Sequence, residues 1–392
     1  MRQSVTLLTS EESFINNYGA ALQGKALCDT IAELGYDVIV VRYHGGDFIE
    51  NDKLYYLYWC KHTLGKFYHR LFPTQITIKK KKLQKEFETE ISLREKFFVE
   101  FQRENFHYFN MRRMNWHMLK KNYPKTNIYM CGSDQIWNPY MRSNRNDPGY
   151  FLAFAPEGTK KIAYAPSFGS SDLPNTAKAN LEELLKDYTA ISVREKSGVD
   201  IVKKYANRDA KWVVDPTLLR TPEQWKRIAR KPKNLPEKYI LCYRFAESDA
   251  TRKAVDETAE RMGLPVVSMP LSDVALQDPY QFVFDAGPRE FIGLIQNAEL
   301  VCTDSFHATV FSVLMKTPVC VFLRESYNSG NSMNSRVYSL LEMLHLEQLI
   351  KTDNENNSKV LECLDVDYTE AHERLKVLRE DSMAFLENAL NN

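Results

Sequence analysis

Residues 300–323, LVCTDSFHATVFSVLMKTPVCVFL, contain the pattern that decides the fold of this protein. The apolar run at 300–303 predicts a buried strand, residues 305–316 predict a helix, and residues 318–323 predict a second strand. Two buried strands joined by one helix are typical of a parallel sheet whose faces are both covered by helices. The pattern therefore predicts an α/β protein.

The same alternation of strands and helices runs through most of the chain and breaks once. Strands are predicted at 4–9, 37–43, 128–131, 161–165, 190–193, 212–214, 239–245, 265–269, 300–303 and 318–323, and helices at 20–34, 250–262, 288–297, 305–316 and the C-terminus. The turn-rich, charged stretch 215–236 predicts a linker. We therefore expect two Rossmann-like domains, residues 1–225 and 226–392, with ligands at the carboxyl ends of their strands.

A segment of different composition, residues 50 to about 125, interrupts the first domain. It is rich in aromatic residues, which cluster at 55–72, and in lysine, with four in a row at 79–82. We expect a mostly helical insertion. Basic and aromatic side chains suit an anionic membrane surface, so the segment is a candidate for peripheral membrane contact. A packed insertion with a solvated lysine face explains the same composition, and we favour that interpretation.

Composition excludes several classes of function. Of 392 residues, 52 are Lys or Arg and 51 are Asp or Glu, so no global charge attracts nucleic acid. No apolar run is long enough to span a membrane or to form a signal peptide. The seven cysteines form no CxxC pair, which indicates free thiols in a reducing cytoplasm and no structural zinc site. Walker, GxGxxG, HExxH and GxSxG motifs are absent.

The residues that follow the strand at 300–303 are the strongest candidates for chemistry. Ser305 is a good N-cap, and His307 falls in the first turn of the predicted helix. Free N–H groups and the helix dipole attract an anion to this end. A histidine there can donate to a phosphate or transfer a proton. A capped helix whose histidine only packs is the alternative that the spacing leaves open.

Two arginines occupy comparable places. Arg194 follows a buried strand at the start of a helix, and Arg336 lies in a polar loop before another helix. The guanidinium fork matches the oxygens of a carboxylate or a phosphate. The alternatives are a structural pair between Arg194 and Glu195, and a solvated loop around Arg336.

A third candidate is the turn Gly132-Ser133-Asp134, which directly follows a predicted strand. Backbone N–H groups in such a turn can hold an anion, and Ser133 adds a hydroxyl. A tight strand-to-helix turn capped by Asp134 explains the same residues.

Taken in order, seven segments of the chain resemble the polysaccharide pyruvyl transferase family. The matching stretches are NYGAALQ at 17–23, GSDQIWN at 132–138, IAYAPSFG at 162–169, SVRE at 192–195, DPTLL at 215–219, TDSFHATVFS at 303–312 and NSR at 334–336. Each stretch alone is weak, but the ordered set is specific. Pro166 and Ala308 depart from the pattern, where a small residue and a glycine are expected.

The resemblance implies a GT-B-like fold, in which two Rossmann-like domains face each other across the active site. It implies transfer of a pyruvyl group from phosphoenolpyruvate to two hydroxyls of one sugar, which gives a cyclic ketal and releases phosphate. The acceptor in this family is often a lipid-linked sugar, such as one on undecaprenyl diphosphate, at the inner face of the cytoplasmic membrane, and the product serves capsule and other surface polysaccharides. The first domain is then the acceptor side and the second the donor side.

Roles for individual residues follow from this implied chemistry. Protonation of the enol carbon needs a group that titrates near neutral pH, and His307 is our choice. We assign Arg194, Ser305, Arg336 and Ser133 to the phosphoenolpyruvate donor, and Asn17, Asp134 and Gln135 to the sugar acceptor. We expect no metal and no cofactor.

Two other functions remain open from the sequence. A GT-B-like glycosyltransferase that uses a nucleotide sugar would have the same fold, although no clear acidic residue set for a ribose is visible. A non-catalytic protein that binds an anion or a sugar would also fit, although the histidine and the arginines argue against it.

Overall fold

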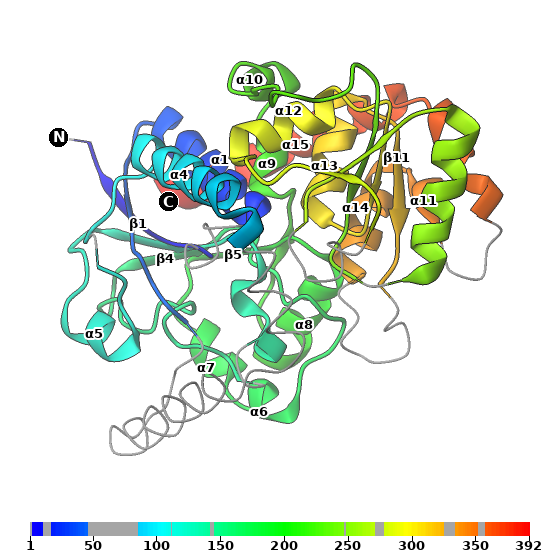
Figure 1. Ribbon diagram of the computed structural model, residues 1–392. Helices are drawn as coiled ribbons and strands as arrows, with labels where there is room; N and C mark the ends of the chain where they lie inside the picture. The colour runs from blue at the N-terminus through cyan, green and yellow to red at the C-terminus, as the bar shows by residue number, and fades with distance from the viewer. Residues whose placement is uncertain are drawn as a thin grey trace, which may run out of the picture.

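The polypeptide forms two α/β halves that lie side by side (Figure 1). The computed structural model describes residues 2–10, 17–45, 85–110, 112–141, 145–246, 248–270, 278–324, 334–351 and 357–392. Each half contains a six-stranded sheet, and every recorded strand pairing is parallel. The predicted α/β fold with two Rossmann-like domains is confirmed.

The sheet of the first half has the strand order β2-β1-β3-β4-β5-β6. Its strands are β1 (Ser4–Leu8), β2 (Asp37–Val40), β3 (Ile128–Cys131), β4 (Lys160–Ala163), β5 (Ala190–Val193) and β6 (Lys211–Trp212). The helices of this half are α1 (Tyr18–Glu33), α4 (Glu88–Asn105), α5 (Trp116–Lys121), α6 (Asn175–Lys178), α7 (Leu181–Leu185) and α8 (Lys196–Ala206). The short helices α9 (Pro216–Leu219) and α10 (Pro222–Lys226) follow β6 and lead to the second half. The order reverses between β1 and β3, and ligands bind beyond the carboxyl ends of strands at such a switch point.

The sheet of the second half has the order β12-β11-β10-β7-β8-β9. Its strands are β7 (Ile240–Tyr243), β8 (Val266–Ser268), β9 (Gln281–Phe282), β10 (Leu300–Thr303), β11 (Val319–Phe322) and β12 (Ile350–Lys351). The helices are α11 (Asp249–Met262), α12 (Pro288–Gln296), α13 (Phe306–Met315), α14 (Ser335–Leu344) and α15 (Thr369–Asn391). The switch point of this sheet lies between β7 and β10.

The central strands formed where the sequence predicted them because their apolar runs are buried on both faces. The bounds predicted at 128–131, 190–193 and 300–303 agree with β3, β5 and β10. The edge strands β9 and β12 were not predicted, since each has only two residues and no apolar run. Within the insertion at 50–125, α4 and α5 are helical as expected, whereas the aromatic cluster at 55–72 and the lysines at 79–82 lie outside the described residues.

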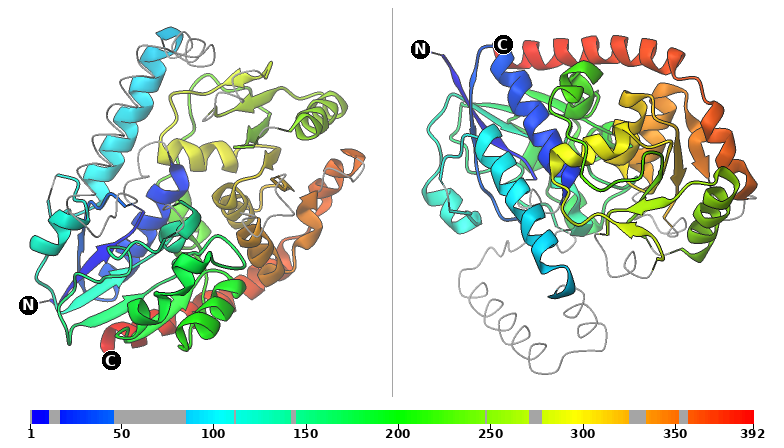
Figure 2. Two further views of the ribbon diagram at one scale, coloured as in Figure 1. Left: turned by 90° about the horizontal axis from the view of Figure 1, so that it is seen from below. Right: turned by 45° about the horizontal axis from the view of Figure 1, so that its top comes forward.

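The C-terminal helix α15 crosses from the second half back to the first, as the right-hand view of Figure 2 shows. Near its start, His372 Nε2 lies 2.8 Å from the carbonyl oxygen of Val313 in the second half. Near its end, Lys160 Nζ donates to the carbonyl of Leu390 at 2.7 Å in the first half. We expected this helix to belong to the second domain, but its contacts connect both. The domain boundary that we placed between residues 225 and 226 stays a prediction.

The halves are also joined by Tyr18, the first residue of α1. Its ring is fully buried and stacks on Phe291 of the second half, with ring centres 4.8 Å apart. Its hydroxyl donates to the carbonyl of Ala286 at 2.9 Å. This contact fixes the start of α1 against the second half, and the next residue of the chain reaches the candidate site.

Candidate active site

The candidate site lies where the two switch points meet, between the start of α1 and the start of α13. Ser305 caps α13, and its hydroxyl accepts from Ala308 N at 3.4 Å. His307 therefore falls in the first turn of α13, as predicted, and its ring lies against the backbone of α1 at Gly19. A Cβ atom at position 19 would be only 2.0 Å from His307 Nδ1, so the ring can occupy this place only because residue 19 is glycine.

His307 faces a carboxylate from the other half. Its Nε2 lies 3.8 Å from Asp215 Oδ2, which is ion-pair distance but too long for a hydrogen bond. Asp215 caps the short helix α9, where its side chain accepts from Thr217 N at 3.0 Å, and it is completely buried. Burial alone would raise the pKa of this carboxyl, but His307 and Arg194 together hold that pKa below its ordinary value. The carboxylate is thus charged and can orient or stabilise a protonated imidazole.

Arg194 lies between two carboxylates of the first half. Its Nη1 is 2.6 Å from Asp215 Oδ2, and its Nη2 is 3.3 Å from Asp134 Oδ1. Glu195 instead accepts a hydrogen bond from the Ser167 hydroxyl, and burial raises the pKa of its carboxyl. The structural pair that sequence suggested between Arg194 and Glu195 is therefore not the pair that forms.

Arg336 is a buried guanidinium that forms no ion pair with a carboxylate in the part of the chain that the structure describes. It lies in the first turn of α14, is 7% exposed and is not in a solvated loop. The amide of Gln135 is oriented with its oxygen toward the guanidinium. This oxygen accepts hydrogen bonds from Arg336 Nη1 at 3.1 Å and from Arg336 Nη2 at 3.3 Å. Burial, with repulsion from Arg194, lowers the pKa of Arg336 to about 10. A bound anion would relieve both effects.

Phe306 connects these charged groups. The Cζ atom of Arg194 lies 4.4 Å from the centre of its ring, and that of Arg336 lies 5.9 Å from it. The ring of His307 meets it edge to face at 5.1 Å. Two guanidinium groups and an imidazole therefore surround one aromatic ring.

Several polar atoms in this cluster make no hydrogen bond with the described residues. They are Arg194 Nε, Arg336 Nε and His307 Nε2, and all three are buried. Buried polar atoms are seldom left unsatisfied, because each costs roughly 1–3 kcal/mol. Unsatisfied guanidinium donors in a buried cluster are suited to an anionic ligand.

The other residues that we assigned from sequence also lie at this junction, mostly in supporting positions. Ser133 is buried, with its hydroxyl 2.9 Å from the carbonyl oxygen of Ala165 and 3.3 Å from Asp215 Oδ2. Asn17 caps α1 by accepting from Ala20 N at 3.0 Å. Their roles toward a donor or an acceptor stay predictions, as do those of the remaining assigned residues.

Sequence reasoning missed three members of the cluster. Asp215 was assigned to a linker, although an Asp followed by Pro is a typical start of a helix. Gly19 was part of a family motif, but nothing in the sequence shows that it touches a residue almost three hundred positions away. Phe306 looked like an ordinary apolar residue in a helix.

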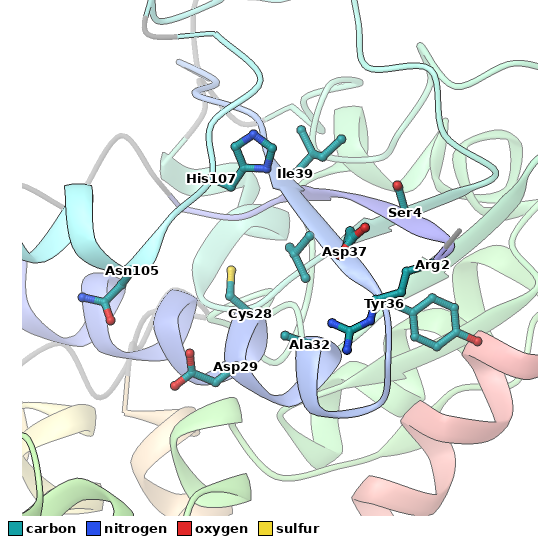
Figure 3. Close-up of a pocket in the computed structure, with 11 residues that line it drawn as sticks. Arg2, Ser4, Cys28, Asp29, Ala32, Tyr36, Asp37, Ile39, Asn105 and His107 are labelled. Carbon is teal, nitrogen blue, oxygen red and sulfur yellow. The ribbon is translucent and has the colours of Figure 1, made fainter.

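A separate pocket of about 520 Å³ lies at the outer edge of the first sheet (Figure 3). Arg2, Asp37 and His107 are among the side chains around it. It contains none of the residues that we assigned from sequence. Among the described residues, no helix could cross a membrane, and no group of three or more His, Cys, Asp or Glu could hold a metal ion.

The fold is the two-domain α/β arrangement of the GT-B-like type, and the candidate site lies between the two halves. A UDP-GlcNAc 2-epimerase from Methanocaldococcus jannaschii matches with a TM-score of 0.52 and 11% identity, over 94% of this chain and 93% of that chain. A proposed UDP-N-acetylglucosamine 2-epimerase from Listeria monocytogenes matches with a TM-score of 0.51 and 11% identity, over 99% and 91%. At such identity the similarity shows the fold alone.

The family is shown by the sequence. The model of the polysaccharide pyruvyl transferase family matches residues 17–326, which is most of the chain. The protein belongs to this family of transferases. No protein of curated function matches the sequence significantly.

Proposed function

We propose that this protein transfers the pyruvyl group of phosphoenolpyruvate to two hydroxyls of one sugar, with formation of a cyclic ketal and release of phosphate. The observation that carries the proposal is Arg336, a buried guanidinium without a carboxylate partner among the described residues, beside a second arginine and a histidine. Phosphoenolpyruvate carries a carboxylate and a phosphate on one small molecule. Such a ligand would give Arg336 the anionic partner that it does not have among the described residues.

The proposed reaction has two steps. In the first, a proton is added to the methylene carbon of the enol, and a sugar hydroxyl oxygen attacks the adjacent carbon and loses its proton. In the second, the bond from that carbon to the phosphate oxygen breaks with its electron pair, and the second hydroxyl closes the ring as it loses its proton. One hydroxyl proton balances the proton on carbon, and the other leaves with phosphate.

His307 suits the proton transfer in this scheme. Imidazole exchanges a proton near neutral pH, and the carboxylate oxygen Oδ2 of Asp215 lies 3.8 Å from its Nε2. Arg336 would bind one acidic group of the donor, and Arg194 would contribute through its unpartnered Nε. Only 9% of the His307 side chain is exposed, so we expect the halves to separate when substrate enters.

We also propose a class of acceptor and a place of action. We expect a sugar of bacterial surface polysaccharide, carried on undecaprenyl diphosphate, and an enzyme that acts in the cytoplasm at the inner membrane. Flotation of the full chain with vesicles that contain anionic lipid tests the membrane contact, and a protein that stays at the bottom of the gradient argues against it.

A thermal-shift experiment separates this proposal from a glycosyltransferase that uses a nucleotide sugar. We expect phosphoenolpyruvate to raise the melting temperature, whereas UDP- and GDP-sugars leave it unchanged. Free phosphate is then measured in mixtures of protein, phosphoenolpyruvate and sugar acceptors. Stabilisation by a nucleotide sugar without any response to phosphoenolpyruvate would overturn the proposal.

A further inference from the structure

An aromatic side chain remains exposed at the switch point of the second sheet. Phe245 lies two positions after the end of β7, and 38% of it is accessible to solvent. Among the described residues, Met141 and Val377 are the other large hydrophobic side chains that are exposed to solvent. A single exposed hydrophobic residue needs no explanation by itself, but Phe245 differs in the contacts that hold it in place.

Phe245 is held by the segments that carry the candidate catalytic groups. Its backbone N–H donates to the carboxylate of Asp304 at 2.9 Å, and the N–H of Ala246 donates to the same carboxylate at 2.7 Å. Asp304 begins the short loop between β10 and α13, three positions before His307. The backbone that carries the Phe245 ring is therefore held beside the loop that leads into the helix of the histidine.

An arginine completes this feature. The Cζ atom of Arg324 lies 4.8 Å from the centre of the Phe245 ring, and Arg324 Nε is 3.2 Å from Asp304 Oδ2. Its backbone N–H donates to the side chain of Asn334 at 3.1 Å, two positions before Arg336. The Arg324 side chain is bound to Asp304 through Nε, and no hydrogen bond joins its terminal nitrogens to the described residues.

We propose that Phe245 and Arg324 form a binding site for the hexopyranose ring of the acceptor. The apolar face of a sugar packs on an aromatic ring, and a guanidinium donates to sugar hydroxyls, so the pair offers both kinds of contact at once. This inference rests on the proposed function. It places one wall of the acceptor site on the second half, whereas the sequence led us to expect the acceptor on the first.

Ligand-observed NMR with three probes tests the site: methyl β-D-galactopyranoside, methyl β-D-glucopyranoside and methyl α-D-mannopyranoside. We expect at least one of them to bind the wild-type protein and to receive saturation from aromatic protons. Phe245→Ala should weaken that binding about tenfold, and Phe245→Trp should restore it. Val377→Ala, which trims an exposed hydrophobic side chain on α15, is the matched control and should bind as the wild type does.

Two results would overturn the inference: none of the three glycosides binds, or Phe245→Ala binds as tightly as the wild type. Thermal shift by phosphoenolpyruvate is measured on the same samples. If phosphoenolpyruvate binds and the glycosides do not depend on Phe245, this inference fails and the proposed donor site stands. If the glycosides depend on Phe245 and phosphoenolpyruvate does not bind, the proposed function fails and the sugar site stands.

Discussion

Replacing Gly19 with alanine should impair the enzyme without removing any chemical group. The added Cβ atom would lie 2.0 Å from His307 Nδ1, and ordinary contact begins at 3.4 Å, so the two must separate by 3.4 − 2.0 = 1.4 Å. Misplacement of a catalytic group by about 1 Å can cost about 100-fold in rate. We therefore expect kcat/KM to fall by about 100-fold or more.

The assay is release of phosphate from phosphoenolpyruvate with an accepted sugar, together with thermal unfolding. Alanine is a better helix former than glycine by about 0.5–1 kcal/mol, so helix propensity alone would stabilise the variant. A lowered melting temperature would therefore report the clash. Lys25→Ala, in the same helix and away from His307, is the control and should keep full activity. Wild-type kcat/KM in Gly19→Ala would refute the placement of His307 against α1.

Other variants test further parts of the site. His307→Gln should lower kcat by about 10²–10⁴-fold, with a melting temperature close to that of the wild type. Asp215→Asn should cost about 3–5 kcal/mol of unfolding free energy, because Arg194 loses a buried partner, and a chemical denaturation series measures this loss. Folding lowers the pKa of Asp215, so its charge stabilises the protein above a pH of about 4. This stabilisation is lost as the pH falls further. Asp215→Asn should therefore lack this part of the loss of stability in acid. Tyr18→Phe should lower unfolding free energy by about 1–3 kcal/mol, since the Ala286 carbonyl loses a buried donor, and unchanged stability would contradict this contact.

Much of the fold could be predicted because the central strands are continuous apolar runs. Burial on both faces of a parallel sheet requires such runs, and they are visible without any knowledge of the neighbouring strands. The edge strands β9 and β12 were not visible, because two residues at a sheet margin carry no periodic signal. The return of α15 to the first half also depends on contacts that no local pattern encodes.

The candidate site could be predicted only in part, for a similar reason. His307 and Ser305 stand out because a strand, a cap and a helix follow one another in the chain. The pairing of Arg194 with Asp215 and Asp134 joins residues that are distant in sequence, so local spacing suggested the neighbouring Glu195 instead. The buried state of Arg336 depends on the packing of α14, which a polar loop in the sequence does not reveal.

Calorimetric titration of phosphoenolpyruvate into the wild-type protein and into Arg336→Gln tests the central claim most directly. We predict measurable binding to the wild type and affinity at least about tenfold lower in the variant, since a buried bond to a charged group is worth about 1.5–3 kcal/mol. The variant should be no less stable than the wild type, because folding already depresses the pKa of this guanidinium. No binding to the wild type, or equal affinity in both proteins, would contradict the claim that this guanidinium holds the donor.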